Sequence, residues 1–180
     1  MTPSPHSIVI TMGDPAGIGP EVICKALADM PAEVRRDIVV AGNIPLMERA
    51  VKVTGTDLRF RESAANDEIA VAHVELDGPM PAFGQLDARA GDAAFRFIAR
   101  AVEMAKSGEA GCIVTAPINK EALNAAGHHY DGHTGMLAAL TGAKSSFMLL
   151  ASERLSAIHV STHVRSEEHT SELQSQNRIS

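Results

Sequence analysis

Short apolar runs alternate with segments of helical periodicity along most of this chain, and no other feature restricts its fold as strongly. Each apolar run has the length of a strand, and the segments between the runs place apolar residues on one helical face. Repeated strand–helix units with apolar strands are typical of α/β domains with a largely parallel sheet. The pattern predicts strands over residues 8–12, 37–42, 69–76 and 111–115, the third at a sheet edge, and helices over residues 20–30, 45–51 and 91–107.

The first predicted strand leads into a glycine-rich turn with the sequence TMGDPAGIGPE, from Thr11 to Glu21. Pro20 suits the start of the following helix, because its missing N–H is not needed there. The third glycine of the dinucleotide-binding fingerprint is absent, and no G-K-S/T sequence marks a Walker loop. We expect Asp14 at the carboxyl end of the strand, the edge at which open α/β sheets bind ligands. A well-formed turn without a ligand is the alternative.

Composition excludes several classes of partner. The net charge is −6, aromatic residues make up 3% of the chain, and Trp is absent, so neither the basic surface nor the stacking side chains of a nucleic-acid binder are present. No apolar run is long enough to span a membrane, and the first residues lack a secretory pattern. We therefore expect a cytoplasmic protein without nucleic-acid or membrane partners. Cys24 and Cys112 are expected to be small core residues rather than nucleophiles or ligands.

Polar residues gather just after predicted strands. Lys120 follows the strand over residues 111–115 at the start of a short helix, where a cation is disfavoured by the helix dipole unless an anion is near. This conflict favours a phosphate or carboxylate ligand, and a solvated surface lysine is the alternative. His133 and Thr134 lie in a polar loop and could hydrogen-bond a substrate, although Thr134 could equally cap the next helix. The tandem His128-His129 is expected to be exposed rather than ligating.

The segment over residues 155–163 bears most on metal chemistry. Its β-branched residues predict a strand, which places His159 and His163 on one face. In a helix the same pair would form an H-x-x-x-H zinc site, but Ile158 and Val160 disfavour that conformation. On a strand, His163 at the end is the better candidate for a metal ligand, and His159 is expected to be an interior histidine. A preceding strand is predicted over residues 147–150.

Several separated blocks together resemble the 4-hydroxythreonine-4-phosphate dehydrogenase (PdxA) family. They are the turn from Thr11 to Glu21, the TAPINKE sequence from Thr115, the Gly132-His133-Thr134 sequence and the IHVSTH sequence that ends at His163. The resemblance covers residues 7–164. It implies the fold of isocitrate and isopropylmalate dehydrogenases, with two α/β domains and a homodimer. It also implies that His133 and Thr134 contact substrate, that His163 is one of three histidines on a divalent metal (Zn, Mg or Co), and that NAD is the cofactor. Lys120 and Asp14 would complete the polar cleft.

The reaction implied by the resemblance is oxidation of 4-phosphooxy-L-threonine to a keto acid, with decarboxylation, in pyridoxal phosphate biosynthesis. Two blocks, Ala90-Gly91-Asp92-Ala93 and the IHVSTH sequence from Ile158 to His163, also resemble a branch acting on 4-phospho-D-threonate or D-erythronate. Gly135 stands where the family usually has an acidic residue. Because two metal ligands and most of the NAD site would lie beyond this chain, we expect the chain alone to be inactive. A non-catalytic, anion-binding α/β module is the alternative of a different class.

The last residues differ abruptly from the rest of the chain. The sequence RSEEHTSELQS, from Arg165 to Ser175, is the in-frame translation of a common sequencing-library adapter, and Ile179-Ser180 fits the adapter bases that follow its index. We therefore expect residues 1–164 to be the amino-terminal part of a two-domain α/β dehydrogenase and residues 165–180 to be non-native and disordered. The acidic and histidine residues of this tail are not interpreted as a metal site.

Overall fold

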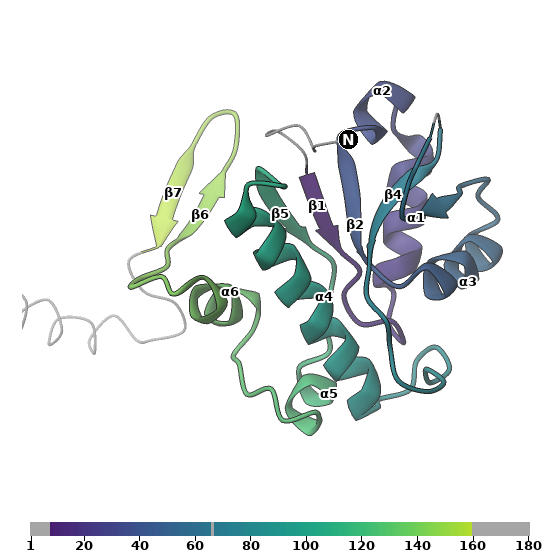
Figure 1. Cartoon of the computed structure of the whole chain (residues 1–180). Coiled ribbons are helices and arrows are strands. Elements are labelled where there is room, and N and C mark those ends of the chain that lie inside the picture. Colours follow the sequence, from purple (N-terminus) through teal and green to yellow (C-terminus); the bar gives the residue numbers. More distant parts are fainter. Residues whose placement is uncertain (1–7, 66, 160–180) are drawn as a thin grey trace, which may run out of the picture. The chain divides into compact units, whose positions relative to one another are not determined.

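The computed structural model of the chain describes residues 8–65 and 67–159 (Figure 1). Contacts divide the chain into two units, Met1–Ala143 and Lys144–Ser180. No helix among the described residues is long and apolar enough to cross a membrane.

The first unit alternates strands and helices, as the apolar runs predict. Its elements are β1 (Ile8–Thr11), α1 (Gly19–Asp29), α2 (Ala32–Arg35), β2 (Ile38–Gly42), α3 (Ile44–Thr54), β3 (Phe60–Arg61), β4 (Ile69–His73), α4 (Ala88–Ser107), β5 (Cys112–Thr115), α5 (Lys120–Ala125) and α6 (His133–Thr141). The prediction of an α/β fold with a largely parallel sheet is confirmed.

The sheet of the first unit has the order β3-β4-β2-β1-β5, and every neighbouring pair is parallel. After β1 and β2 the chain forms β3 at the edge of the sheet, inserts β4 between β3 and β2, and then crosses back to add β5 on the other side of β1. The strand order therefore reverses between β1 and β5. The carboxyl ends of the strands at such a reversal are the place where open α/β sheets bind ligands.

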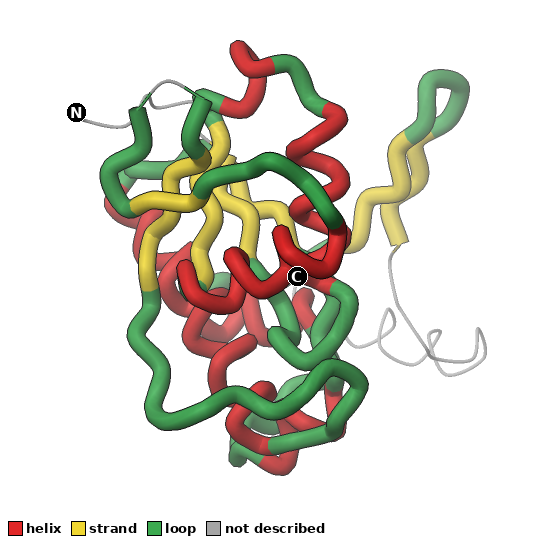
Figure 2. The backbone as a smooth tube through the Cα atoms, turned by 90° about the vertical axis from the view of Figure 1, so that its right-hand side faces the viewer, coloured by secondary structure: helices red, strands yellow, loops and turns green. Residues whose placement is uncertain are grey.

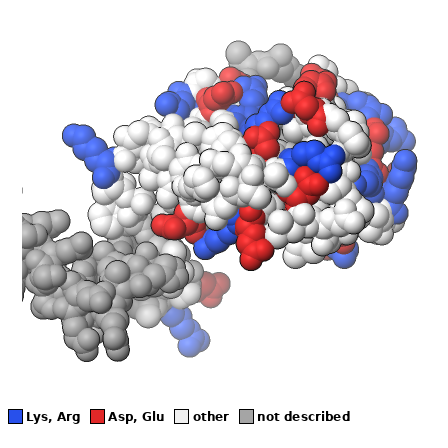
Figure 3. Space-filling view, turned by 90° about the horizontal axis from the view of Figure 1, so that it is seen from below, with Lys and Arg blue, Asp and Glu red and all other residues white. Residues whose placement is uncertain are grey.

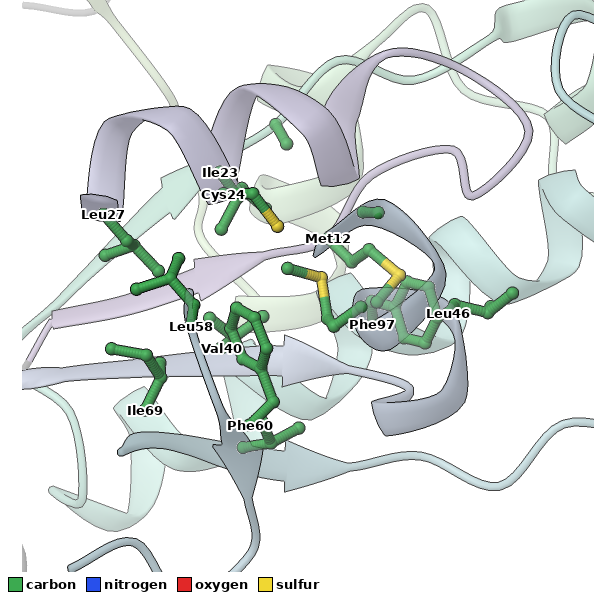
Figure 4. Packing of buried hydrophobic residues seen from close by; sticks show 14 of the residues in the cluster. Met12, Ile23, Cys24, Leu27, Val40, Leu46, Leu58, Phe60, Ile69 and Phe97 are labelled. Atoms are coloured by element: carbon green, nitrogen blue, oxygen red, sulfur yellow. The ribbon is translucent and has the colours of Figure 1, made fainter. Parts of the chain in front are cut away.

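Helices cover both faces of this sheet (Figures 1 and 2). Val9, Val39 and Ile113 share one register across three strands and pack with residues of α4. On the opposite face, the side chains of α1 and α3 meet alternate strand residues such as Val40. Figure 4 shows this cluster between helix and sheet, with Phe60 and Phe97 among its largest side chains. Burial of both faces explains why the strands are apolar rather than alternating.

Side-chain caps set the starts of three helices. Asp87 accepts a hydrogen bond from the N–H of Arg89 and begins α4, Asn43 caps α3, and Asn119 caps α5. Helix α4 thus begins at Ala88 rather than at the predicted Gly91, because the Asp87 carboxylate accepts a hydrogen bond from the N–H of Arg89 and stabilises an earlier first turn.

Two predictions about the edges of the sheet are wrong. Strand β4 is not an edge strand, because the two-residue strand β3 pairs with it at Phe60 and Arg61. Strand β5 is not fully buried: it lies at the end of the sheet among the described residues, and the side chain of Val114 is 46% exposed. Cys112, on the same strand, is exposed rather than part of the core, whereas Cys24 is buried as expected. Burial raises the pKa of the Cys24 thiol to about 11, which makes this cysteine a poor nucleophile.

The second unit contains an antiparallel hairpin, β6 (Met148–Ala151) with β7 (Ser156–His159). Both strands were expected, and in register Met148 is opposite His159. The large apolar side chains Phe147, Leu149 and Leu155 are 68%, 58% and 72% exposed.

Candidate active site

The turn after β1 is fixed by its own backbone and by the loop after β5. The Asp14 N–H donates to the carbonyl of Pro117 over 3.0 Å, and its carboxylate accepts a hydrogen bond of 2.8 Å from the N–H of Ala16. The Asp14 residue is 6% exposed. The structure thus places Asp14 at the carboxyl edge of the sheet, as predicted, with its carboxylate folded into the turn.

The two loops approach each other so closely that only glycine fits between them. Gly13 has a φ of +73°, and a Cβ atom at this position would overlap the carbonyl oxygen of Pro117. A Cβ on Gly19 would likewise overlap the carbonyl oxygen of Met12. The glycines therefore serve close backbone packing at the junction of β1 and β5.

Burial raises the pKa of the Asp14 carboxyl above its ordinary value, and the N–H groups of Ala16 and Gly17 act in the opposite direction. Because the folded state holds the proton more tightly than the unfolded chain, the ionised carboxylate opposes folding. This penalty develops as the pH rises through the unfolded and then the folded pKa, and it is absent below both.

Replacing Asp14 with Asn is therefore expected to raise the free energy of unfolding at neutral pH. The amide oxygen of Asn can still accept from the Ala16 N–H, and no charge is buried. The gain should disappear below about pH 4, where an unfolded Asp is protonated. Urea unfolding at the two pH values measures this, with the exposed Asp67→Asn as a matched control. A variant less stable than the wild type at neutral pH would contradict the prediction.

His133 stands at the start of α6 and contacts the loop after β5. Burial lowers the pKa of its imidazole, and the backbone of Ala116 acts in the opposite direction. Its Nε2 atom is buried and has no hydrogen-bond partner among the described residues. An unpaired buried polar atom costs about 1–3 kcal/mol, so a polar atom from a ligand or water at this nitrogen would be favourable.

Lys120 ends the loop after β5, and Thr134 follows His133 at the start of α6. Lys120 is the first residue of α5, and its Cε atom lies 3.7 Å from the point at which a Cβ on Gly132 would stand. Its side chain makes no ion pair within the described part of the chain. Thr134 is exposed, and it is not the helix cap that was considered as its alternative role, because Gly132 occupies the cap position. The loop from Ala116 to Lys120 thus contacts the Asp14 turn on one side and the start of α6 on the other.

The predicted metal ligand His163 lies outside the described residues. Across residues 8–65 and 67–159, no group of three His, Cys, Asp or Glu side chains is arranged to hold a metal ion. The described residues alone therefore do not form the expected metal site.

Sequence reasoning missed Arg49, which holds the Asp14 turn from the side of α3. Its guanidinium donates to the carbonyl oxygens of Pro15 over 2.9 Å and Pro81 over 3.2 Å, and it lies 3.8 Å over the ring of Phe83. The N–H of Gly84 also donates to the carbonyl of Ala16. Nothing in the local sequence signals this role, because all the oxygen acceptors belong to the backbone.

Sequence reasoning also misplaced His128, which is not fully exposed. Its side chain is 22% exposed and pairs with Asp92 of α4, whereas the adjacent His129 is exposed as expected. The charged residues around the carboxyl ends of the strands are of both signs, and the view from below shows no single basic patch (Figure 3).

Residues 33–179 match the family described as pyridoxal phosphate biosynthetic protein PdxA, and this range is more than half of the chain. The chain belongs to the PdxA family. The match begins after the Asp14 turn and runs into residues 165–179, so the adapter origin of that tail stays a prediction.

Named relatives of this PdxA-family chain are dehydrogenases. It is 44% identical over 164 residues to the D-threonate 4-phosphate dehydrogenase of Cupriavidus necator, covering 87% of this chain and 49% of that protein. It is 38% identical over 165 residues to the 4-hydroxythreonine-4-phosphate dehydrogenase of Beijerinckia indica, covering 88% and 48%. The crystal structure of a 4-hydroxythreonine-4-phosphate dehydrogenase from Burkholderia phymatum matches with a TM-score of 0.82 and 43% identity, covering 91% and 52%. The chain thus spans about half the length of the relatives it matches.

Proposed function

We propose that the full-length protein is an NAD-dependent dehydrogenase that oxidises the secondary alcohol of a phosphorylated hydroxy acid. The observation that carries this proposal is the junction of β1 and β5, where Asp14, Lys120 and His133 border one loop at the ligand-binding edge of the sheet. The names of the relatives support the reaction class.

Each residue has a role that its surroundings permit. Lys120, which makes no ion pair among the described residues, supplies a cation for a phosphate or carboxylate at a helix start where an anion is favourable. His133 offers a polar atom that lacks a partner among the described residues. Asp14 fixes the turn between these groups and the sheet. Bound NAD supplies the hydride acceptor, and the protein supplies orientation.

Two compounds of this class are candidate substrates. The first expectation from sequence is 4-phosphooxy-L-threonine, as in pyridoxal phosphate synthesis, and the second is 4-phospho-D-threonate. The identity of 44% to the D-threonate 4-phosphate dehydrogenase, against 38% to the 4-hydroxythreonine-4-phosphate dehydrogenase, favours the second. Steady-state formation of NADH with each compound, in the full-length homodimer, distinguishes them by kcat/KM.

Replacing His163 with Ala in the full-length protein is expected to abolish metal-dependent turnover. The reason is that loss of one imidazole ligand weakens divalent metal binding severely. NADH formation is measured across a titration of Zn²⁺, Mg²⁺ or Co²⁺, and bound metal is quantified after dialysis. His159→Ala, on the same strand pattern, is the matched control. Wild-type turnover and metal content in the His163 variant would overturn the assignment.

Calorimetry tests the alternative of an anion-binding module. A dehydrogenase should bind NAD, and the metal should strengthen its binding of the phosphorylated hydroxy acid. Uptake of the anion without metal, combined with no NAD binding and no NADH formation, would support the module instead.

A further inference from the structure

A second group of side chains, which the proposed function does not use, connects the loop before His133 to α4. Nε2 of His128 lies 2.9 Å from Oδ1 of Asp92, in the second turn of α4. An ionised carboxylate only accepts hydrogen bonds, so the imidazole donates. The contact joins residues 36 apart in sequence and attaches the loop after α5 to α4.

Aromatic stacking fixes the same imidazole in a second direction. The ring of Phe95 lies parallel to that of His128 with the centroids 3.8 Å apart, and the ring of Tyr130 stacks on Phe95 at 6.2 Å. Phe95 and Tyr130 also pack against a buried cluster that contains Met136 of α6, which is 0% exposed. The 128–132 loop is therefore held against α4 at His128 and at Tyr130.

His133 is the residue at which this loop becomes a helix, and Met136 secures the first turn of that helix. A loop held at His128 and Tyr130 has little freedom to move His133 away from the Ala116 backbone. We propose that Asp92 and His128, with Phe95, are positioning residues that set the place of His133 in the site. The inference rests on the proposed function for its catalytic consequence, but the placement of His133 can be measured without turnover.

Asp92 is held from its other side by Arg96, whose guanidinium lies 3.9 Å from Oδ2. Arg96 also donates to the carbonyl of Glu75 and reaches Asp77, both in the segment after β4. The carboxylate of Asp92 is thus oriented before it meets His128. Neither Asp92 nor His128 is assigned contact with substrate, so loss of either should act through His133.

The test compares Asp92→Ala with Asp92→Asn. Alanine removes the acceptor of the His128 hydrogen bond, whereas asparagine keeps an oxygen at the same position. Glu103→Gln, which removes a carboxylate from an exposed ion pair on the same helix, is the matched control. In the 180-residue chain, NMR reports the imidazole signals of His133 and the hydrogen exchange of amides 128–136.

We expect the Ala variant to increase amide exchange in this segment at least tenfold and to shift the His133 signals toward those of an exposed imidazole. The Asn variant and the control should stay close to the wild type. In the full-length enzyme, the Ala variant should raise KM more than it lowers kcat, and the Asn variant should restore KM.

Unchanged His133 signals and exchange in the Ala variant would overturn the positioning role, whatever the activity. Equal disturbance by the Ala variant and the control would also overturn it, since the effect would then be general to α4. Absence of dehydrogenase activity in every protein, with the His133 changes present, would refute the proposed function and leave the positioning role in place.

Discussion

Replacing Gly91 with Ala is expected to destabilise the first unit by about 3 kcal/mol or more. A Cβ atom on Gly91 would overlap the backbone carbonyl of Ala122 and lie 2.6 Å from the backbone nitrogen of Leu123. Backbone atoms cannot rotate away as the end of a side chain can, so α4 and α5 would have to separate. Urea unfolding followed by circular dichroism measures the loss.

Gly135 provides the control for that experiment. It lies in the first turn of α6, it is exposed, and no heavy atom is within 4 Å of the position of its Cβ. Gly135→Ala should therefore stabilise the chain by about 0.5–1 kcal/mol through helix propensity alone. If the two alanine variants change the free energy of unfolding by the same amount and sign, close packing of α4 on α5 is not the cause.

Replacing His133 with Ala in the full-length protein is expected to lower kcat/KM for the phosphorylated substrate by about ten- to a hundredfold. A hydrogen bond to a charged group contributes about 1.5–3 kcal/mol, which corresponds to that range. The substitution also removes the contact of the imidazole with the Ala116 backbone, so stability is measured beside activity. The measurement is steady-state NADH formation, together with the unfolding midpoint.

His129→Ala is the matched variant, because it removes the same side chain from an exposed position in the same loop. It should leave both kcat and KM at the wild-type level. Equal activity of the His133 and His129 variants would exclude a substrate contact at His133. A His133 variant that is inactive because it is unfolded would be recognised by its unfolding midpoint, and His133→Gln would then replace it.

The buried strands and long helices were predictable from sequence because their signals are local. The side chains of the apolar runs that contain Val9 and Val40 can all be buried only in a sheet that is covered on both faces. Edge strands carry no such signal. Strand β3 contributes only Phe60 and Arg61, too short a run for period-2 alternation, and β5 reads as buried although Val114 is half exposed.

The sequence predicts where the candidate site residues lie in the fold, but not the long-range contacts that hold the loops around them. Asp14, Lys120 and His133 follow strand ends or open helices, which is a position that sequence periodicity reveals. Arg49 and Asp92 act through partners far away in sequence, at Pro81 and His128. Their roles depend on strand order and helix packing, which single-sequence patterns do not contain.

The return of the chain from β4 to β5, on the other side of β1, has a consequence for folding. The Asp14 turn and the loop at Pro117 are far apart in sequence, and α4 must cross the sheet before they meet. Closing such a long loop costs entropy before its contacts form, so non-local pairings of this kind fold slowly. Intermediates with most of their helices formed would therefore still lack the contact between the Asp14 turn and the Pro117 loop. The proposed ligand site would be assembled together with the last long-range contacts.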